Sequence, residues 1–357
     1  MLKDNALAKA TKSNYKTPVR YFEEMCIKLG LPNKVTEKAL IAYIGLRLET
    51  KVLKQTVIGD INAICTNAIL KGEDVQIADD SPLVGKLMKG YGNTITRPTL
   101  QRVAISIDKL SLLASHFLFN ANTNPAYRTF HAAAVIAFWC MLRPSEYTYH
   151  SKHPQKLLIN SNVKFGVMGS SQYVELTLIN PKTAQHGSQK VVASCKCKIC
   201  EWICPVHVLK KYISWKQKSF PTALLHPSRA FFLIKNNKVK LNASPLRYDL
   251  WCESFPAFAE ILGINAATFK PHCMRISGAS YYFLSGIHDE VIKILGRWTS
   301  ECWRRYLRLS AEQAIFLVDE KILNDVAPNG FSTSELLRML SANDPSVIHK
   351  KIEEEEA

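Results

Sequence analysis

One stretch of the sequence concentrates residue types that together could handle a phosphate ester. In PHCMRISGASYYFLSGIHDEVIKILGRWTSECWRRYLR, residues 271–308, His272 and Arg275 are three positions apart and would share one face of a helix. A Gly-Arg-Trp triplet ends at Trp298, and a single tyrosine, Tyr306, then lies among further arginines. Such a tyrosine can attack a phosphodiester whose charge is neutralised by paired guanidinium groups. An exposed basic helix with a half-buried tyrosine would give the same short pattern.

Two upstream segments offer complementary groups. In MLRPSEYTYH, Arg143 follows a long apolar segment and Glu146 comes three residues later, an arrangement that also fits a simple ion pair. In LINPKTAQH, Lys182 falls at the tip of a predicted hairpin, where a lysine is ordinarily solvated. Lys164 and Lys190 flank the same sheet and remain alternatives to it. Neither segment is informative alone, but the order of all these groups along the chain is specific.

This order closely resembles the tyrosine recombinase, or site-specific integrase, family. In detail it is similar to the eukaryotic Crypton and DIRS-like transposon recombinases, in which GRW and a nearby YxR are usual. The resemblance covers most of the chain and implies a DNA strand transferase of a mobile element, acting through a 3′-phosphotyrosine intermediate without metal or ATP. A domesticated protein that keeps the fold and binds DNA without cleaving it is the first alternative. A DNA relaxase resembling type IB topoisomerases is the second.

The resemblance implies a role for each catalytic group. Arg143 and Arg275 would clamp the scissile phosphate and stabilise charge that grows in the transition state. Lys182 would protonate the leaving 5′-oxygen, and Tyr306 would be the nucleophile.

Further residues would support this chemistry. His272 would assist proton transfer and contact the phosphate. Trp298 stands where many relatives have a second histidine; its indole can donate one hydrogen bond and pack against the nucleophile, but it cannot act as an acid. Glu146 would orient the basic groups. Four further arginines are expected to bind DNA: Arg297, Arg304, Arg305 and Arg308.

The overall charge also indicates a polyanionic partner. The 357 residues include 46 Lys and Arg against 30 Asp and Glu, a net charge of +16 that is spread over both halves of the chain. Such a surplus favours nucleic acid, although a generically basic housekeeping protein would show it as well. No apolar run could cross a bilayer, and the first residues lack the apolar core of a secretory signal. We therefore expect an intracellular protein that binds double-stranded DNA, in the nucleus if the host is eukaryotic.

Apolar periodicity predicts the elements that must position these groups. The fold class expected is mainly α with a small antiparallel β-sheet. Short helices are expected after Ser13 and Thr36 and before Gly72, and a further helix that carries Tyr306 is expected after Ser300. β-rich segments at 163–168, 173–179 and 190–193 predict about three strands. Residues 230–245 are compatible with one further short hairpin.

Breaks in periodicity predict the domain organisation. A helical core DNA-binding domain is expected over 1–92, a linker over 93–105, and a mixed α/β catalytic domain of tyrosine-recombinase type over 106–320. A C-terminal amphipathic helix and an acidic tail occupy 321–357. In the resembling family such a helix often docks into a neighbouring protomer, so we expect a dimer or tetramer on DNA. Intramolecular packing of this helix is the alternative.

Six of the ten cysteines lie in apolar contexts and are read as reduced core residues, and four residues near the middle of the chain are candidate zinc ligands. In SCKCKICEWICPVH, the set Cys197, Cys200, Cys204 and His207 offers four soft ligands within eleven residues. The spacing is not that of a standard zinc knuckle, and packed cysteines are the alternative. Any zinc here would be structural, because no cofactor is expected for catalysis.

Overall fold

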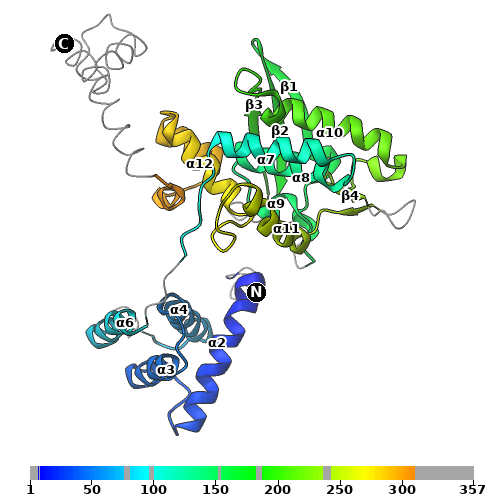
Figure 1. Cartoon of the computed structure of the whole chain (residues 1–357). Coiled ribbons are helices and arrows are strands. Elements are labelled where there is room, and N and C mark those ends of the chain that lie inside the picture. Colours follow the sequence, from blue (N-terminus) through cyan, green and yellow to red (C-terminus); the bar gives the residue numbers. More distant parts are fainter. Residues whose placement is uncertain are drawn as a thin grey trace, which may run out of the picture. The chain divides into compact units, whose positions relative to one another are not determined.

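The structure, a computed structural model, divides the chain into two compact units, Met1–Thr99 and Leu100–Ala357 (Figure 1). The expected linker 93–105 spans this boundary. Lys182 and the expected C-terminal helix and tail lie outside the described residues. Among the described residues, no helix combines the length and the apolar character that a bilayer crossing requires. The structure describes residue 7 and residues 9–75, 81–95, 100–151, 154–181, 187–235 and 243–309.

The first unit is helical, and its own hydrophobic core includes Leu40 and Ile64. Thr36 and Ser81 cap two of its helices, because each hydroxyl accepts a hydrogen bond from a backbone N–H at 3.2 Å. Gly72 ends another helix in the left-handed conformation, with φ 90°. The helices described in this unit are α2 (Lys9–Lys28), α3 (Glu37–Glu49), α4 (Lys54–Lys71) and α6 (Pro82–Thr94).

The second unit is built around the long apolar helix α8. Every residue of α8 from Thr129 to Trp139 is buried, because α7, α10 and α12 all pack against it. The α-helices described here are α7 (Ile107–Asn120), α8 (Ala126–Trp139), α9 (Pro144–Tyr147), α10 (Pro205–Ser219), α11 (Tyr248–Ile261), α12 (Cys273–Leu284) and α13 (Asp289–Gly296). The 3-10 helices are η1 (Pro154–Lys156), η2 (Asn160–Asn162), η3 (Glu201–Ile203), η4 (Thr222–Leu225) and η5 (Glu301–Tyr306).

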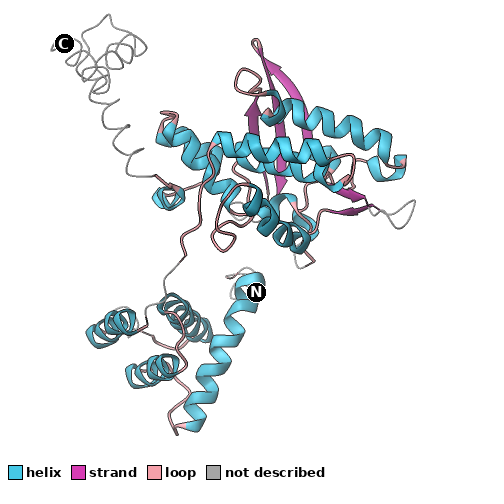
Figure 2. Cartoon of the chain, viewed as in Figure 1, coloured by secondary structure: helices cyan, strands magenta, loops and turns pink. Residues whose placement is uncertain are grey.

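A small antiparallel sheet packs against α10, which confirms the predicted fold class (Figure 2). It has three strands in the order β1-β2-β3, and the last pair of β2 and β3 joins Ile179 to Ser188. Beyond that pair, the Asn180 N–H donates to the Gly187 carbonyl at 2.8 Å, so Lys182 belongs to the connection between these strands. The strands of this sheet are β1 (Val163–Met168), β2 (Ser171–Ile179) and β3 (Ser188–Ser194), and a separate hairpin pairs β4 (Leu233–Lys235) with β5 (Ala243–Pro245).

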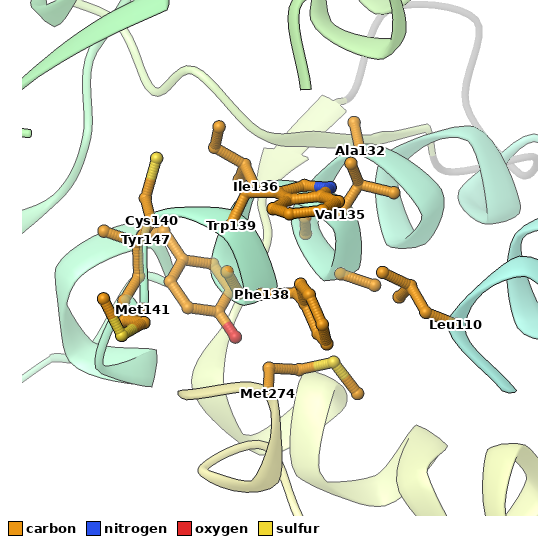
Figure 3. Close-up of a cluster of buried hydrophobic side chains, with 14 of the residues drawn as sticks. Leu110, Ala132, Val135, Ile136, Phe138, Trp139, Cys140, Met141, Tyr147 and Met274 are labelled. Atoms are coloured by element: carbon orange, nitrogen blue, oxygen red, sulfur yellow. The ribbon is translucent and has the colours of Figure 1, made fainter. Parts of the chain in front are cut away.

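Helix α12 approaches the end of α8 very closely. A Cβ atom on Gly278 would lie 2.2 Å from the Phe138 carbonyl oxygen, so only glycine permits this contact without a shift. One helical turn earlier on α12, Met274 lies beside Phe138 in the core (Figure 3). After α8 the chain reverses through Met141, whose φ of 45° is left-handed and costs a non-glycine residue about 1 kcal/mol. This reversal leads directly to Arg143 and α9.

Candidate active site

Arg275 of α12 is the buried centre of the site, with no exposed surface. One terminal nitrogen donates to the Met141 carbonyl, and the other donates to the Gly296 carbonyl at 2.5 Å. Burial, and then the charges of Arg297 and Arg143, lower the pKa of Arg275 to about 9. The guanidinium therefore remains charged at neutral pH. It is held by the main chain of two other segments.

The rings of Trp298 and Tyr306 cover this guanidinium. Cζ of Arg275 lies 4.1 Å from the centroid of the indole and 5.3 Å from that of the phenol ring. The two ring centroids are 5.0 Å apart. A Cβ atom on Gly296 would fall 1.5 Å from a carbon of the Trp298 ring, so glycine makes room for the indole. The structure thus brings together the predicted arginine, tryptophan and tyrosine.

Glu146 links Arg143 to Arg297. Its Oε1 accepts from the Arg143 guanidinium at 2.9 Å, and its Oε2 accepts from the Arg143 backbone N–H at 2.7 Å and from Arg297 at 2.8 Å. Burial acts to raise the pKa of Glu146, but Arg297 and Arg143 outweigh it and the pKa lies below its usual value. The carboxylate therefore stays ionised and holds both arginines in place.

Arg297 corrects one expectation, because it is not a DNA-facing residue in this structure. It ends α13 in the left-handed conformation, with φ 60°, and is only 3% exposed. Besides Glu146, its guanidinium donates to the carbonyls of Cys140 and Met141, both at 3.0 Å. The left-handed turn places this side chain among buried acceptors, so Arg297 positions its neighbours.

His272 immediately precedes α12, and its ring centroid lies 5.4 Å from that of Tyr306. Burial and the charges of Arg275, Arg143 and Arg102 lower the pKa of His272 to about 4. The imidazole is therefore neutral at pH 7 and can accept a proton. Arg143 and Arg102 therefore both act electrostatically on His272. Arg102 is absent from the sequence-based candidates because its segment was expected to be a linker.

The segment that carries Tyr306 differs from the expected α-helix after Ser300. It is η5, a six-residue 3-10 helix whose last residue is Tyr306. The Ser280 hydroxyl of α12 fixes this end, since it donates to the Tyr306 carbonyl at 3.3 Å and accepts from the Arg308 N–H at 3.0 Å. Because η5 ends at Tyr306, the phenol ring lies over Arg275.

The three other arginines expected to bind DNA lie at the surface or fold back on the backbone. Arg304 is exposed and pairs with Glu301 at 2.9 Å and Asp289 at 3.0 Å. Arg305 is exposed. The Arg308 guanidinium is half-buried and donates to backbone carbonyls, including that of Arg305 at 2.7 Å. Arg305 is the member of this set best placed to meet a polyanion.

Among the described residues, only a few buried polar side-chain atoms lack a hydrogen-bond partner. Those few atoms all belong to residues of the candidate active site. They are the Nε atoms of Arg275 and Arg297 and the Nε1 atom of Trp298. Unpaired buried donors cost free energy, so they mark a place where a missing acceptor would be stabilising. An anion within reach of both Arg275 Nε and Trp298 Nε1 would supply such an acceptor.

The predicted zinc ligands are corrected in one position. The ligand atoms of Cys195, Cys197, Cys204 and His207 all lie within 4.8 Å of one another. Cys200 is not a member of this set, and its sulfur lies 3.9 Å from the Ser111 hydroxyl. Cys195 takes its place because it is the first residue after β3, which ends beside the first turn of α10.

The overall fold of the chain is that of the tyrosine recombinases and integrases. No family model matches the sequence, and no curated protein sequence matches it. The Tn1549 transposon integrase in complex with transposon right end DNA superposes with a TM-score of 0.55 at 15% identity, over 89% of this chain and 95% of that chain. The XerH site-specific recombinase bound to a palindromic difH substrate gives 0.54 at 12% identity, over 84% and 75%.

Proposed function

We propose that this protein is a site-specific DNA recombinase that cuts and rejoins DNA through Tyr306. The observation that carries the proposal is the convergence on one tyrosine of a charged arginine, a neutral histidine and an indole. The arginine and histidine come from the start of α12, and the indole follows α13. The tyrosine recombinase fold supports this reading independently of the side chains.

The chemistry follows from these positions. Tyr306 Oη attacks the phosphorus atom, the bond from phosphorus to the 5′-oxygen breaks, and a 3′-phosphotyrosine and a 5′-hydroxyl form. The phenol proton passes to the neutral His272, and Lys182 gives a proton to the 5′-oxygen. Religation reverses these transfers. The phosphotyrosyl bond retains the free energy of the phosphodiester, so neither ATP nor a metal is required for the reaction.

The buried donors without a partner support a binding position for the phosphate. One non-bridging oxygen would accept from Arg275 Nε and the other from Trp298 Nε1, which would satisfy both groups. Arg143 would add a second guanidinium, held in place by Glu146. A phosphate that enters also offsets the repulsion between His272 and the arginines. The histidine pKa should therefore rise on binding, which favours proton transfer from the tyrosine.

The finer identity rests on the sequence motifs. GRW at 296–298 and the YxR from Tyr306 to Arg308 support a Crypton or DIRS-like recombinase of a mobile element. The net charge of +16 supports double-stranded DNA as the partner. Strand exchange by this chemistry needs several protomers, so we propose a dimer or tetramer on DNA, in the nucleus of a eukaryotic host.

The test is a covalent adduct. A nicked suicide duplex that carries the DNA flanking the coding region is incubated with the protein, and SDS-stable complexes are separated by electrophoresis. Wild type should give an adduct and Tyr306→Phe none. Tyr281→Phe is the matched control on α12 and should retain the adduct. No adduct from wild type that still binds the duplex would favour the non-cleaving DNA-binding protein.

A further inference from the structure

A cluster of three thiols and one imidazole lies where β3 leads into α10, outside the set of residues around Tyr306. Nδ1 of His207 is 2.9 Å from Cys197 Sγ, 3.4 Å from Cys204 Sγ and 3.8 Å from Cys195 Sγ. The sulfur atoms of Cys195 and Cys204 are 3.6 Å apart. Four potential ligands therefore surround one point.

We propose that Cys195, Cys197, Cys204 and His207 bind a structural zinc ion. In a tetrahedral zinc site with bonds of about 2.3 Å to sulfur and 2.05 Å to nitrogen, neighbouring sulfurs lie about 3.8 Å apart and sulfur and nitrogen about 3.6 Å apart. The cluster has this size, and small shifts of the exposed Cys197 would equalise its distances. Thiolate and imidazole ligands suit zinc, and four protein ligands leave no open position for catalysis.

The surroundings of the cluster fit a bound metal. The backbone N–H of Lys196 donates to Cys204 Sγ at 3.1 Å, a contact that stabilises and orients a thiolate ligand. A zinc ion with three thiolates carries a net negative charge. Lys196 and Lys198 alternate with the cysteines, so positive charge lies next to the site in sequence.

The ion would fasten the end of β3 to the start of α10. Cys195 follows the end of β3, Cys204 precedes α10, and His207 lies in the first turn of α10. The loop between them is attached to α8, because the indole N–H of Trp139 donates to the Ile203 carbonyl at 2.6 Å. Helix α8 leads to Arg143, so the zinc would stiffen the scaffold behind the active site and take no part in the reaction.

Metal content tests the proposal directly. The full chain, made without a polyhistidine tag, is analysed for bound metals by mass spectrometry. Wild type should contain about one zinc per chain, and Cys195→Ser should contain at least about tenfold less. Cys200→Ser is the matched control, since it alters a thiol of the same loop that lies outside the set, and it should retain the zinc.

Two further measurements keep the test decisive if Cys195→Ser folds poorly. A chelator should lower the Tm of wild type and of Cys200→Ser. Cobalt(II) added to the chelated wild type should give the visible bands of a tetrahedral thiolate complex. Wild type without zinc, or a Tm that chelator leaves unchanged, would overturn the proposal. So would a Cys195–Cys204 disulfide, detected by counting free thiols in denaturant, or zinc lost from Cys200→Ser and retained in Cys195→Ser.

Discussion

Two arginines of the site, Arg275 and Arg143, are held by different kinds of acceptor. Carbonyl oxygens hold Arg275, whereas a carboxylate, Glu146, holds Arg143. Carbonyls do not titrate, so acid does not weaken the hold on Arg275. The hold on Arg143 depends on the ionisation of Glu146, whose pKa lies below its usual value. Acid, or a substitution of Glu146, should therefore disturb Arg143 more than Arg275.

Replacing Glu146 tests the buried pair. Glu146→Gln leaves Arg297 buried without a countercharge, so the free energy of unfolding should fall by about 3 kcal/mol. Urea unfolding, monitored through tryptophan fluorescence, measures this change in the second unit, because all six tryptophans lie there. Glu301→Gln removes an exposed carboxylate with two basic partners and should change stability much less. An equal effect of both substitutions would contradict the assigned role of Glu146.

The same carboxylate makes stability depend on pH in a defined direction. Because the folded pKa is lower than the ordinary 4.5, folding favours the ionised form. The contribution of Glu146 to the free energy of unfolding is complete above pH 4.5 and is lost as the pH falls through the pKa of the folded state. Wild type should therefore lose stability more steeply than Glu146→Gln below pH 4.5, as measured by urea midpoints across a pH series.

Trp298→Phe tests whether the indole N–H meets the phosphate. The change keeps an aromatic ring over Arg275 and removes a buried donor that has no partner in the free protein. We expect adduct formation on the suicide duplex to slow about tenfold or more, while DNA affinity changes little. Rates equal to wild type would show that the indole only packs.

The charge state of His272 can be followed by NMR. Its imidazole signal should titrate at a pKa of about 4, because burial and neighbouring arginines oppose protonation. Arg143→Gln removes one of these charges and should move the pKa toward 6.5, the ordinary value. Since the unfolded histidine binds its proton at higher pH, this group should make the protein less stable as pH falls from 6.5 toward 4. A titration near 6.5 in wild type would contradict the described environment.

Much of the site could be predicted from residue types and spacing. Tyr306, Arg275 and His272 do converge, and Glu146 does hold Arg143. Other features depend on backbone conformation and burial, which a motif does not reveal. The sequence did not reveal three features for this reason. Arg297 turns inward at a left-handed position. Cys195, rather than Cys200, lies beside His207, and the charge of Arg102, in an extended segment, acts on His272.

At the scale of elements, the site depends on the contact between α12 and the end of α8. Gly278 permits that contact, and Arg275, nearly one turn earlier on the same helix, reaches the carbonyl of Met141 just after α8. The separation of these two helices therefore sets the position of the buried guanidinium.

Gly278→Ala tests this dependence. The new methyl group would collide with the Phe138 carbonyl, which cannot move without its helix. We expect a loss of about 1–3 kcal/mol in stability of the second unit and a slower cleavage rate. Gly59→Ala in α4 is the matched control, because its Cβ would meet nothing within 4 Å. It should stabilise its helix by about 0.5–1 kcal/mol and leave tryptophan fluorescence unchanged. A neutral Gly278→Ala would contradict the close contact.

The elements themselves were largely predictable from periodicity. Residues 163–168 form β1 as predicted, and Thr36 does cap α3. Ser13 was wrongly expected to start the first helix: α2 begins at Lys9, because the polar residues before Ser13 can also be helical. The expected helix around Tyr306 is a short 3-10 segment, since contacts with α12, rather than local propensity, fix its end.

At the scale of the whole molecule, the net charge of +16 should dominate affinity for DNA. We expect affinity for a duplex to fall about a thousandfold between 50 and 200 mM salt, measured by fluorescence anisotropy. Tyr306→Phe should show the same salt dependence, because it leaves every charge in place. A weak dependence on salt would contradict DNA as the partner.

The tyrosine that lies over Arg275 has a consequence for selectivity. In the free protein the ring of the proposed nucleophile lies against the Arg275 guanidinium, and leaving this cation costs about 1–2 kcal/mol. A small diester brings little binding energy to displace the ring, whereas a long duplex contributes contacts remote from the reacting atoms. We therefore expect the protein without bound duplex not to react with short phosphodiesters. Accordingly, bis-nitrophenyl phosphate should be hydrolysed no faster by wild type than by Tyr306→Phe.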